Sequence, residues 1–119
     1  MAAPNIVNVT TITGKTAVQA ITTTPADIIT NNAASNTVLK VNTLIIANID
    51  GTAAADVTVS VFRSSTQWRI ANTISVPADS SLIVIDKNSV IYLEEGDAIR
   101  LTASANGDLE AVCSYEIIG

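Results

Sequence analysis

Apolar and polar residues alternate one by one along most of the chain after residue 36, and this period of two constrains the fold more than any other feature. The stretch "ADVTVSVFR" places Val57, Val59 and Val61 on one face, and "AIRLTAS" (98–104) repeats the pattern. Successive side chains of a strand point to opposite faces of a sheet, so this period predicts strands with one buried face. We therefore expect a fold built from half-buried strands.

Short polar segments separate these runs at intervals of about 8–12 residues. They include "DGTAA" (50–54), "EEGD" (94–97) and "ANGD" (105–108), and the Asn-Gly of the last is a strong hairpin signal. Regular turns between short alternating strands are typical of a sandwich of two antiparallel sheets. The sequence predicts an all-β, antiparallel β-sandwich, jelly-roll or Ig-like, with about eight strands in a single domain.

One run, "TVLKVNTLIIANI", carries apolar residues on both parities. Leu39 and Val41 share one parity, whereas Leu44 and Ile46 have the other. This pattern predicts either a strand that is partly buried on both faces or a strand bent by a bulge.

The first 35 residues alternate less clearly, and we separate them, as an N-terminal arm with the first strands, from a sandwich core at 36–119. "NIVNVTTITG" and "KTAVQAITT" indicate two strands around Gly14. "TPADIITNNAASN" fits a strand with a loop, which we favour, or a short helix with Pro25 at its first position. The extreme N-terminus is expected to be an extended arm that a neighbouring protein orders.

The composition indicates a surface that other subunits cover. Charged residues make up 14% of the chain and hydrophobic residues 48%, whereas ordinary globular proteins carry roughly 25% charged residues. So little charge favours an oligomer or a component of a lattice. The net charge of −5 and the dispersed positions of the six basic residues argue against binding to nucleic acid. The N-terminus lacks the features of a signal peptide, and no apolar run is long enough to span a membrane, so we expect synthesis in the cytoplasm and no membrane partner.

Groups for catalysis are scarce. The chain has no histidine, the commonest general base and metal ligand, and its one cysteine is Cys113. Cys113 shares a parity with Leu109, Ala111 and Ile117, so we expect a small core residue rather than a nucleophile. We expect neither an enzyme nor a cofactor.

The densest group of carboxylates is the "EEGD" segment, where Glu94, Glu95 and Asp97 surround Gly96. Calcium is the functional interpretation, because acidic loops bind it, but the alternating acidic pattern of an EF-hand loop is missing. We favour a solvated turn between strands, with Gly96 at a positive φ. The three carboxylates are kept as weak calcium candidates, and no other metal ligand is proposed.

The single tryptophan, Trp68, follows a predicted turn. It could stack on a sugar or a base, but an isolated aromatic residue is more often an anchor in an interface or a core. We predict that Trp68 is an interface residue.

Several motifs recur together in the second part of the chain: "NIDGTAAADVTV", "ISVPADS", "YLEEGDAIRLTASA" and a final "SYE". With them, residues 48–118 resemble small β-sandwich virion proteins of tailed bacteriophages, especially phages of cyanobacteria (cyanophages) and of marine bacteria. The N-terminal third matches less well. The resemblance implies a viral structural protein without catalytic residues, either a capsid decoration (cement) protein or a small neck or tail component.

Charge favours the first of these roles, because a negative protein is repelled by packaged DNA and suits the outside of the shell. We therefore expect a cement protein on the capsid surface of the virion, bound to the major capsid protein and other virion proteins. The role suggests a homo-oligomer, with a trimer as the guess. The alternatives are a phage neck, tail or fibre component, and a lectin-like or calcium-dependent binding module.

Overall fold

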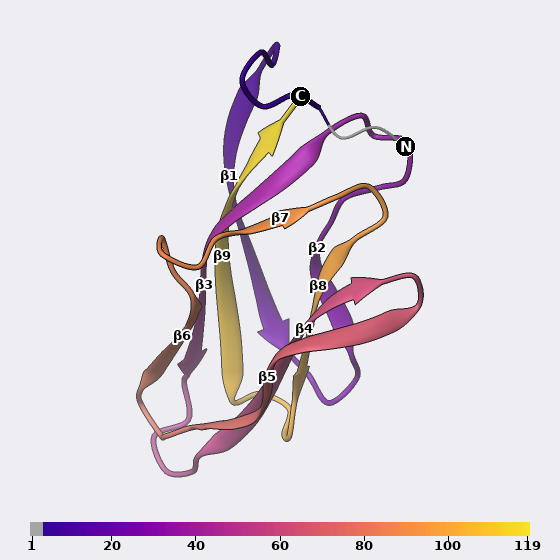
Figure 1. Ribbon diagram of the computed structural model, residues 1–119. Helices are drawn as coiled ribbons and strands as arrows, with labels where there is room; N and C mark the ends of the chain where they lie inside the picture. The colour runs from indigo at the N-terminus through magenta and orange to yellow at the C-terminus, as the bar shows by residue number, and fades with distance from the viewer. Residues whose placement is uncertain (1–3) are drawn as a thin grey trace.

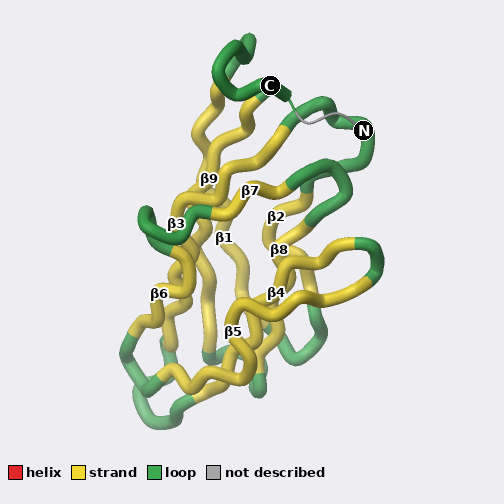
Figure 2. The backbone as a smooth tube through the Cα atoms, viewed as in Figure 1, coloured by secondary structure: helices red, strands yellow, loops and turns green. Residues whose placement is uncertain are grey.

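The computed structural model describes residues 4–119, which form nine strands in two layers and no helix (Figures 1 and 2). The strands are β1 (Ile12–Ile21), β2 (Ala26–Thr30), β3 (Val38–Asn48), β4 (Ala55–Arg63), β5 (Thr66–Val76), β6 (Ser81–Ile85), β7 (Ile91–Leu93), β8 (Ala98–Ala103) and β9 (Leu109–Ile118). Within this range no helix is long and apolar enough to cross a membrane.

The strands pair from the two ends of the chain inward. β1 pairs with β9, β2 with β8, β3 with both β6 and β7, and β4 with β5, all antiparallel. Successive pairs fall in alternate sheets: sheet 1 has the order β1-β9-β3-β6, with β7 also on β3, and sheet 2 has the order β2-β8-β4-β5. This winding is that of a jelly roll, which confirms the predicted sandwich and decides between its two predicted topologies.

The core lies between the two sheets and is built from the residues that alternation placed inside. Val57, Val59, Ile99 and Leu101 expose at most 1% of their surface. Cys113 is fully buried there as well, as predicted, and burial raises the pKa of its thiol to about 11.

Apolar residues of both parities in β3, Leu39 and Val41 on one parity and Leu44 and Ile46 on the other, face the same core. The register of β3 against β9 shifts between Val41 and Thr43, where one extra residue is inserted. A bulge of this kind reverses the facing of everything beyond it. Leu39 and Val41 before the bulge and Leu44 after it are therefore all buried. Of the two predictions for this strand, the bulge is confirmed.

The N-terminal region differs from the expectation. β1 is one strand that runs through Gly14, because it pairs with β9 without interruption from Ile12 to Ile21. The predicted pair of strands around Gly14 is therefore wrong, and residues 4–11 lie outside any strand. β2 confirms the favoured strand-and-loop interpretation over the helix. Residues 1–3 of the expected arm lie outside the described residues.

The "ANGD" segment is a turn but not a hairpin. Gly107 has a φ of 84°, as the Asn-Gly pair suggests. However, the strands on either side, β8 and β9, belong to different sheets, so the segment carries the chain from one layer to the other. The hairpin prediction is wrong because a turn sequence fixes the local reversal only, whereas the neighbours of each strand are set by long-range pairing.

Candidate functional site

The sandwich is open along one side, between β5 at the edge of sheet 2 and β6 and β7 at the edge of sheet 1. Trp68 pairs with Val61, and Ile74 pairs with the fully buried Val57, so these residues of β5 lie on the core-facing side of sheet 2. Even so, Trp68 is 62% exposed and Ile74 is 40% exposed. They are exposed because β5 is an edge strand whose inner face is incompletely covered by the opposite sheet.

Two shallow hollows lie next to one another on this side. The first, of about 350 Å³, is lined by Val61, Arg63, Trp68, Ile91 and Tyr92. The second, of about 490 Å³, lies between residues 70–74 of β5 and residues 82–84 of β6. The large apolar or aromatic residues that are exposed here form what we call the open-side face: Trp68, Ile70, Ile74 and Tyr92.

The position of Trp68 agrees with an interface role, which stays a prediction. Its surroundings differ in one respect from what the sequence suggested. Tyr92, which is distant in sequence, lines the same hollow and is itself 41% exposed. The open side therefore presents two aromatic rings with aliphatic neighbours, a composition that suits contact with a protein surface.

The "EEGD" corner leads from β7 in sheet 1 to β8 in sheet 2. Gly96 has a φ of 89°, as predicted. The corner is not the solvated turn that we expected, because the Asp97 side chain is only 2% exposed. Nε of Arg63 donates to Oδ1 of Asp97 at 2.8 Å, Nη2 of Arg63 donates to Oδ2, and the backbone N–H of Glu94 donates to Oδ2 at 2.9 Å. The expectation failed because the turn is packed against the end of β4, which carries Arg63.

The charge state of the corner follows from these contacts. Burial alone would raise the pKa of Asp97, but the hydrogen bonds from Arg63 and Glu94 and the charge of Arg63 outweigh it. The net result is a pKa below the usual value of 3.8 for Asp97. The pKa of Arg63 is raised, first by its hydrogen bonds to Asp97. The pair is therefore ionised at neutral pH.

The other two carboxylates of the corner also have protein partners. Oε2 of Glu94 accepts a hydrogen bond from Arg63 at 2.9 Å, and Oε2 of Glu95 accepts one from the backbone N–H of Asn36 at 3.0 Å. Oε1 of Glu95 is covered and meets no donor among the described residues. Nowhere in residues 4–119 are three or more His, Cys, Asp or Glu side chains grouped so that they could hold a metal ion.

Two buried asparagines hold the loops around the core, and the sequence interpretation missed both. Nδ2 of Asn31 donates to the carbonyls of Thr37 and Leu93 at 2.9 and 3.0 Å. Nδ2 of Asn48 donates to the carbonyls of Ala53 and Val76 at 3.0 and 2.9 Å. Each lies at or just beyond the end of a strand, where asparagine is also an ordinary turn residue, so the sequence gives no signal that would single them out.

Comparison with protein-family models gives no match, and comparison with curated protein sequences gives none either. Among solved structures, the chain is similar to the subunit of Bacillus endospore appendages, which form a family of disulfide-linked pili. That likeness has 14% identity, covers 99% of this chain and 96% of the other, and has a TM-score of 0.54. A pentameric capsid protein from metagenomic phage sequences has 17% identity, 85% and 59% coverage, and a TM-score of 0.41. The similarity to the appendage subunit is one of fold alone. The similarity to the capsid protein is too low to support any argument.

Proposed function

We propose that this chain is a non-catalytic structural protein of a phage particle, a decoration (cement) protein that binds the outer capsid shell and stabilises the head. The observation that carries the proposal is the open-side face. Trp68, Tyr92 and two isoleucines, Ile70 and Ile74, lie exposed along one edge of the sandwich. A monomeric protein rarely exposes clustered apolar residues unless they bind a partner.

The chemistry of this face favours a protein partner. Aromatic residues with an arginine at the margin, here Arg63, are the groups that contribute most to protein interfaces. The hollows are shallow, so they suit the projections of a partner surface better than an enclosed small ligand. A cement protein repeats this contact over a whole lattice, and moderate contacts between linked copies then add up through avidity.

The charge and the fold are compatible with a place on the outside of the shell. The net charge of −5 disfavours contact with packaged DNA. The jelly roll is also the fold of a pilus subunit, so the same architecture builds assemblies elsewhere. On this proposal the partners are the major capsid protein and other virion proteins.

The test is a binding experiment on heads stripped of this protein. Trp68→Ala and Ile74→Ser should reduce binding to the heads at least tenfold, because each removes an exposed apolar contact. Val7→Ser is the matched control, since Val7 is 92% exposed but lies outside the open-side face. Heads that bind the two variants as tightly as the wild-type protein would refute the role of this face.

Copy number separates the decoration role from the neck, tail or fibre alternative. Quantitative mass spectrometry of purified particles should find hundreds of copies for a decoration protein. A single ring of cyclic symmetry at the neck or tail would give about a dozen copies or fewer. A count of about a dozen or fewer, with the labelled protein found at one vertex of the head only, would favour the neck, tail or fibre alternative over decoration.

A further inference from the structure

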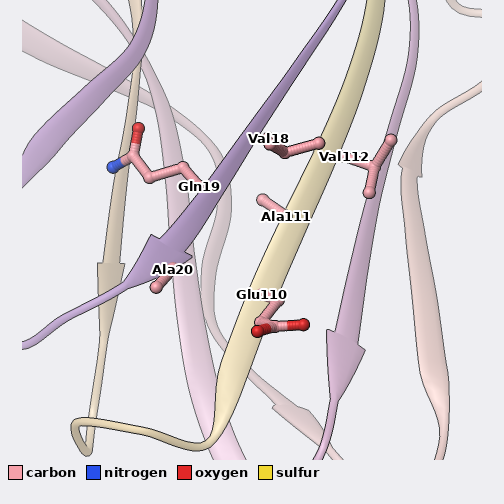
Figure 3. A pocket seen from close by; sticks show the side chains of 6 residues that line it. All are labelled: Val18, Gln19, Ala20, Glu110, Ala111 and Val112. Carbon is pink, nitrogen blue, oxygen red and sulfur yellow. The ribbon is translucent and has the colours of Figure 1, made fainter.

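A second apolar surface lies on the outer face of sheet 1, away from Trp68. Val18 of β1 is directly opposite Val112 of β9, Val112 is opposite Ile45 of β3, and Ile45 is opposite Ile83 of β6. Opposite residues share a face, so these four side chains form one row across the strands β1, β9, β3 and β6, which we call the valine row. Figure 3 shows Val18 and Val112 on the neighbouring strands β1 and β9. Val18, Ile83 and Val112 are 73%, 62% and 43% exposed.

The rows on either side are nearly free of charge. Toward one end of the strands lie Thr16, Ser114 and Thr43, and toward the other lie Ala20, Glu110, Ala47 and Ser81. Glu110 is the charged residue among them. Alternating strands with one wet face normally place charged or strongly polar residues there. This outer face has instead an apolar centre with small neutral residues around it.

We propose that the outer face of sheet 1 binds a second copy of this chain, sheet against sheet, in a two-fold dimer. The four strands β1, β9, β3 and β6 have 10, 10, 11 and 5 residues, and at about 4.8 Å between strands and roughly 3.3 Å per residue they give a face of about 570 Å². Two such faces bury about 1,100 Å² in total, which clears the roughly 1,000 Å² that a biological interface needs. Sheets that pack face to face at about 10 Å interdigitate side chains of this size.

The charge of this face is compatible with a second copy as the occupant. Each chain carries a net charge of −5, which opposes self-association in general, but the rows around Val112 carry Glu110 as their one charged residue, so contact through this face brings few like charges together. A two-fold axis along the valine row places Glu110 of one copy opposite Ser114 of the other, because their rows lie on opposite sides of the axis. An axis along the strands, between β9 and β3, places it opposite Ala47. Neither arrangement brings the two Glu110 carboxylates together.

Sedimentation equilibrium over a range of concentrations tests the proposal. The wild-type protein should have twice the 12.3 kDa mass of one chain. Val112→Lys places an ammonium group at the centre of the contact in both copies and should raise the dissociation constant at least about a hundredfold. Val7→Lys is the matched control and should leave the dimer intact. Far-UV circular dichroism should show that both variants are folded. If Val112→Lys does not fold, Val18→Lys on the edge strand β1 is the second test.

A wild-type protein that is monomeric at every concentration would overturn the inference. A dimer that neither Val112→Lys nor Val18→Lys weakens would overturn it as well, because its contact then lies elsewhere. The result is independent of the proposed function: Trp68→Ala should lose binding to heads but keep the dimer, whereas Val112→Lys should lose the dimer. If Trp68→Ala alone dissociated the dimer, the contact would be assigned to the open-side face and not to sheet 1.

Discussion

Replacing Arg63 by alanine should destabilise the fold by about 2–3 kcal/mol at neutral pH. The variant removes two of the three hydrogen bonds that the Asp97 carboxylate accepts and leaves only the one from the Glu94 N–H. A fully buried pair that loses one partner costs about 3–5 kcal/mol. We expect less here because the Arg63 side chain is 47% exposed, so water can reach part of the space that it leaves. The contact with the exposed Glu94 should add little.

The pH dependence distinguishes this mechanism from a loss of packing. In the wild-type protein the pKa of Asp97 is lowered on folding, so its contribution is present above the unfolded value of about 3.9 and is lost as the pH falls through the folded pKa. Without Arg63, burial dominates and raises the folded pKa of Asp97. The variant should therefore gain stability as the pH falls from neutral towards about 4. The difference between the two proteins should be largest at neutral pH and shrink in acid.

Urea unfolding followed by circular dichroism, between about pH 7 and pH 3, measures both free energies of unfolding. Arg69→Ala is the matched control, because Arg69 is an exposed arginine on the neighbouring strand β5. It should change the stability by less than about 0.5 kcal/mol. The loss of stability for Arg63→Lys should lie between those of Arg69→Ala and Arg63→Ala, since an ammonium group keeps the charge but cannot form the paired hydrogen bonds. A loss for Arg63→Ala that is as small as the control, or that is constant with pH, would refute the reasoning.

Three further predictions concern the core and the turns. Val59→Asp or Leu101→Asp should prevent folding, because each places an unpaired charge between the sheets at a cost of several kcal/mol; soluble, folded protein by circular dichroism would show that the facing assignment is wrong. Asn48→Ala should cost about 1–3 kcal/mol in urea unfolding, because the buried backbone carbonyl of Val76 and the less covered one of Ala53 lose their donor; an unchanged midpoint would contradict this. Gly96→Ala should cost about 1 kcal/mol because its φ is positive, whereas Gly14→Ala, whose added methyl group meets no atom within 4 Å, should have little effect; equal effects would argue against a role for φ.

The parts of the fold that the sequence predicted are those with a local signal. Alternation depends on the pleat of a single strand, and so the inward faces of β4, β8 and β9 followed from it directly. The change of parity in β3 also carried a local signal, because a bulge is one of the two ways to place Leu39 and Leu44 in the same core. The partners of each strand carry no such signal. The "ANGD" turn therefore looked like a hairpin, although it joins two sheets.

The exposure of Trp68 is a consequence of strand order. The pairing of Trp68 with Val61 shows that this residue is on the inward side of β5. Whether an inward residue is buried depends on how far the opposite sheet extends, and β5 is the last strand of its own sheet. An inward residue on an edge strand is therefore a site where a jelly roll can offer apolar surface to a partner without changing its core.

The ion pair at the corner shows which part of a functional-looking motif can be recognised in advance. Asp97 is followed immediately by Ala98 and Ile99, which begin a buried strand. A carboxylate so close to the start of a buried strand is covered by its neighbours, and a covered carboxylate must find a donor. That requirement is present in the sequence and argues against a solvated turn. The identity of the donor cannot be recognised in the sequence, because Arg63 lies 34 residues earlier and only the winding of the jelly roll brings the end of β4 to this corner.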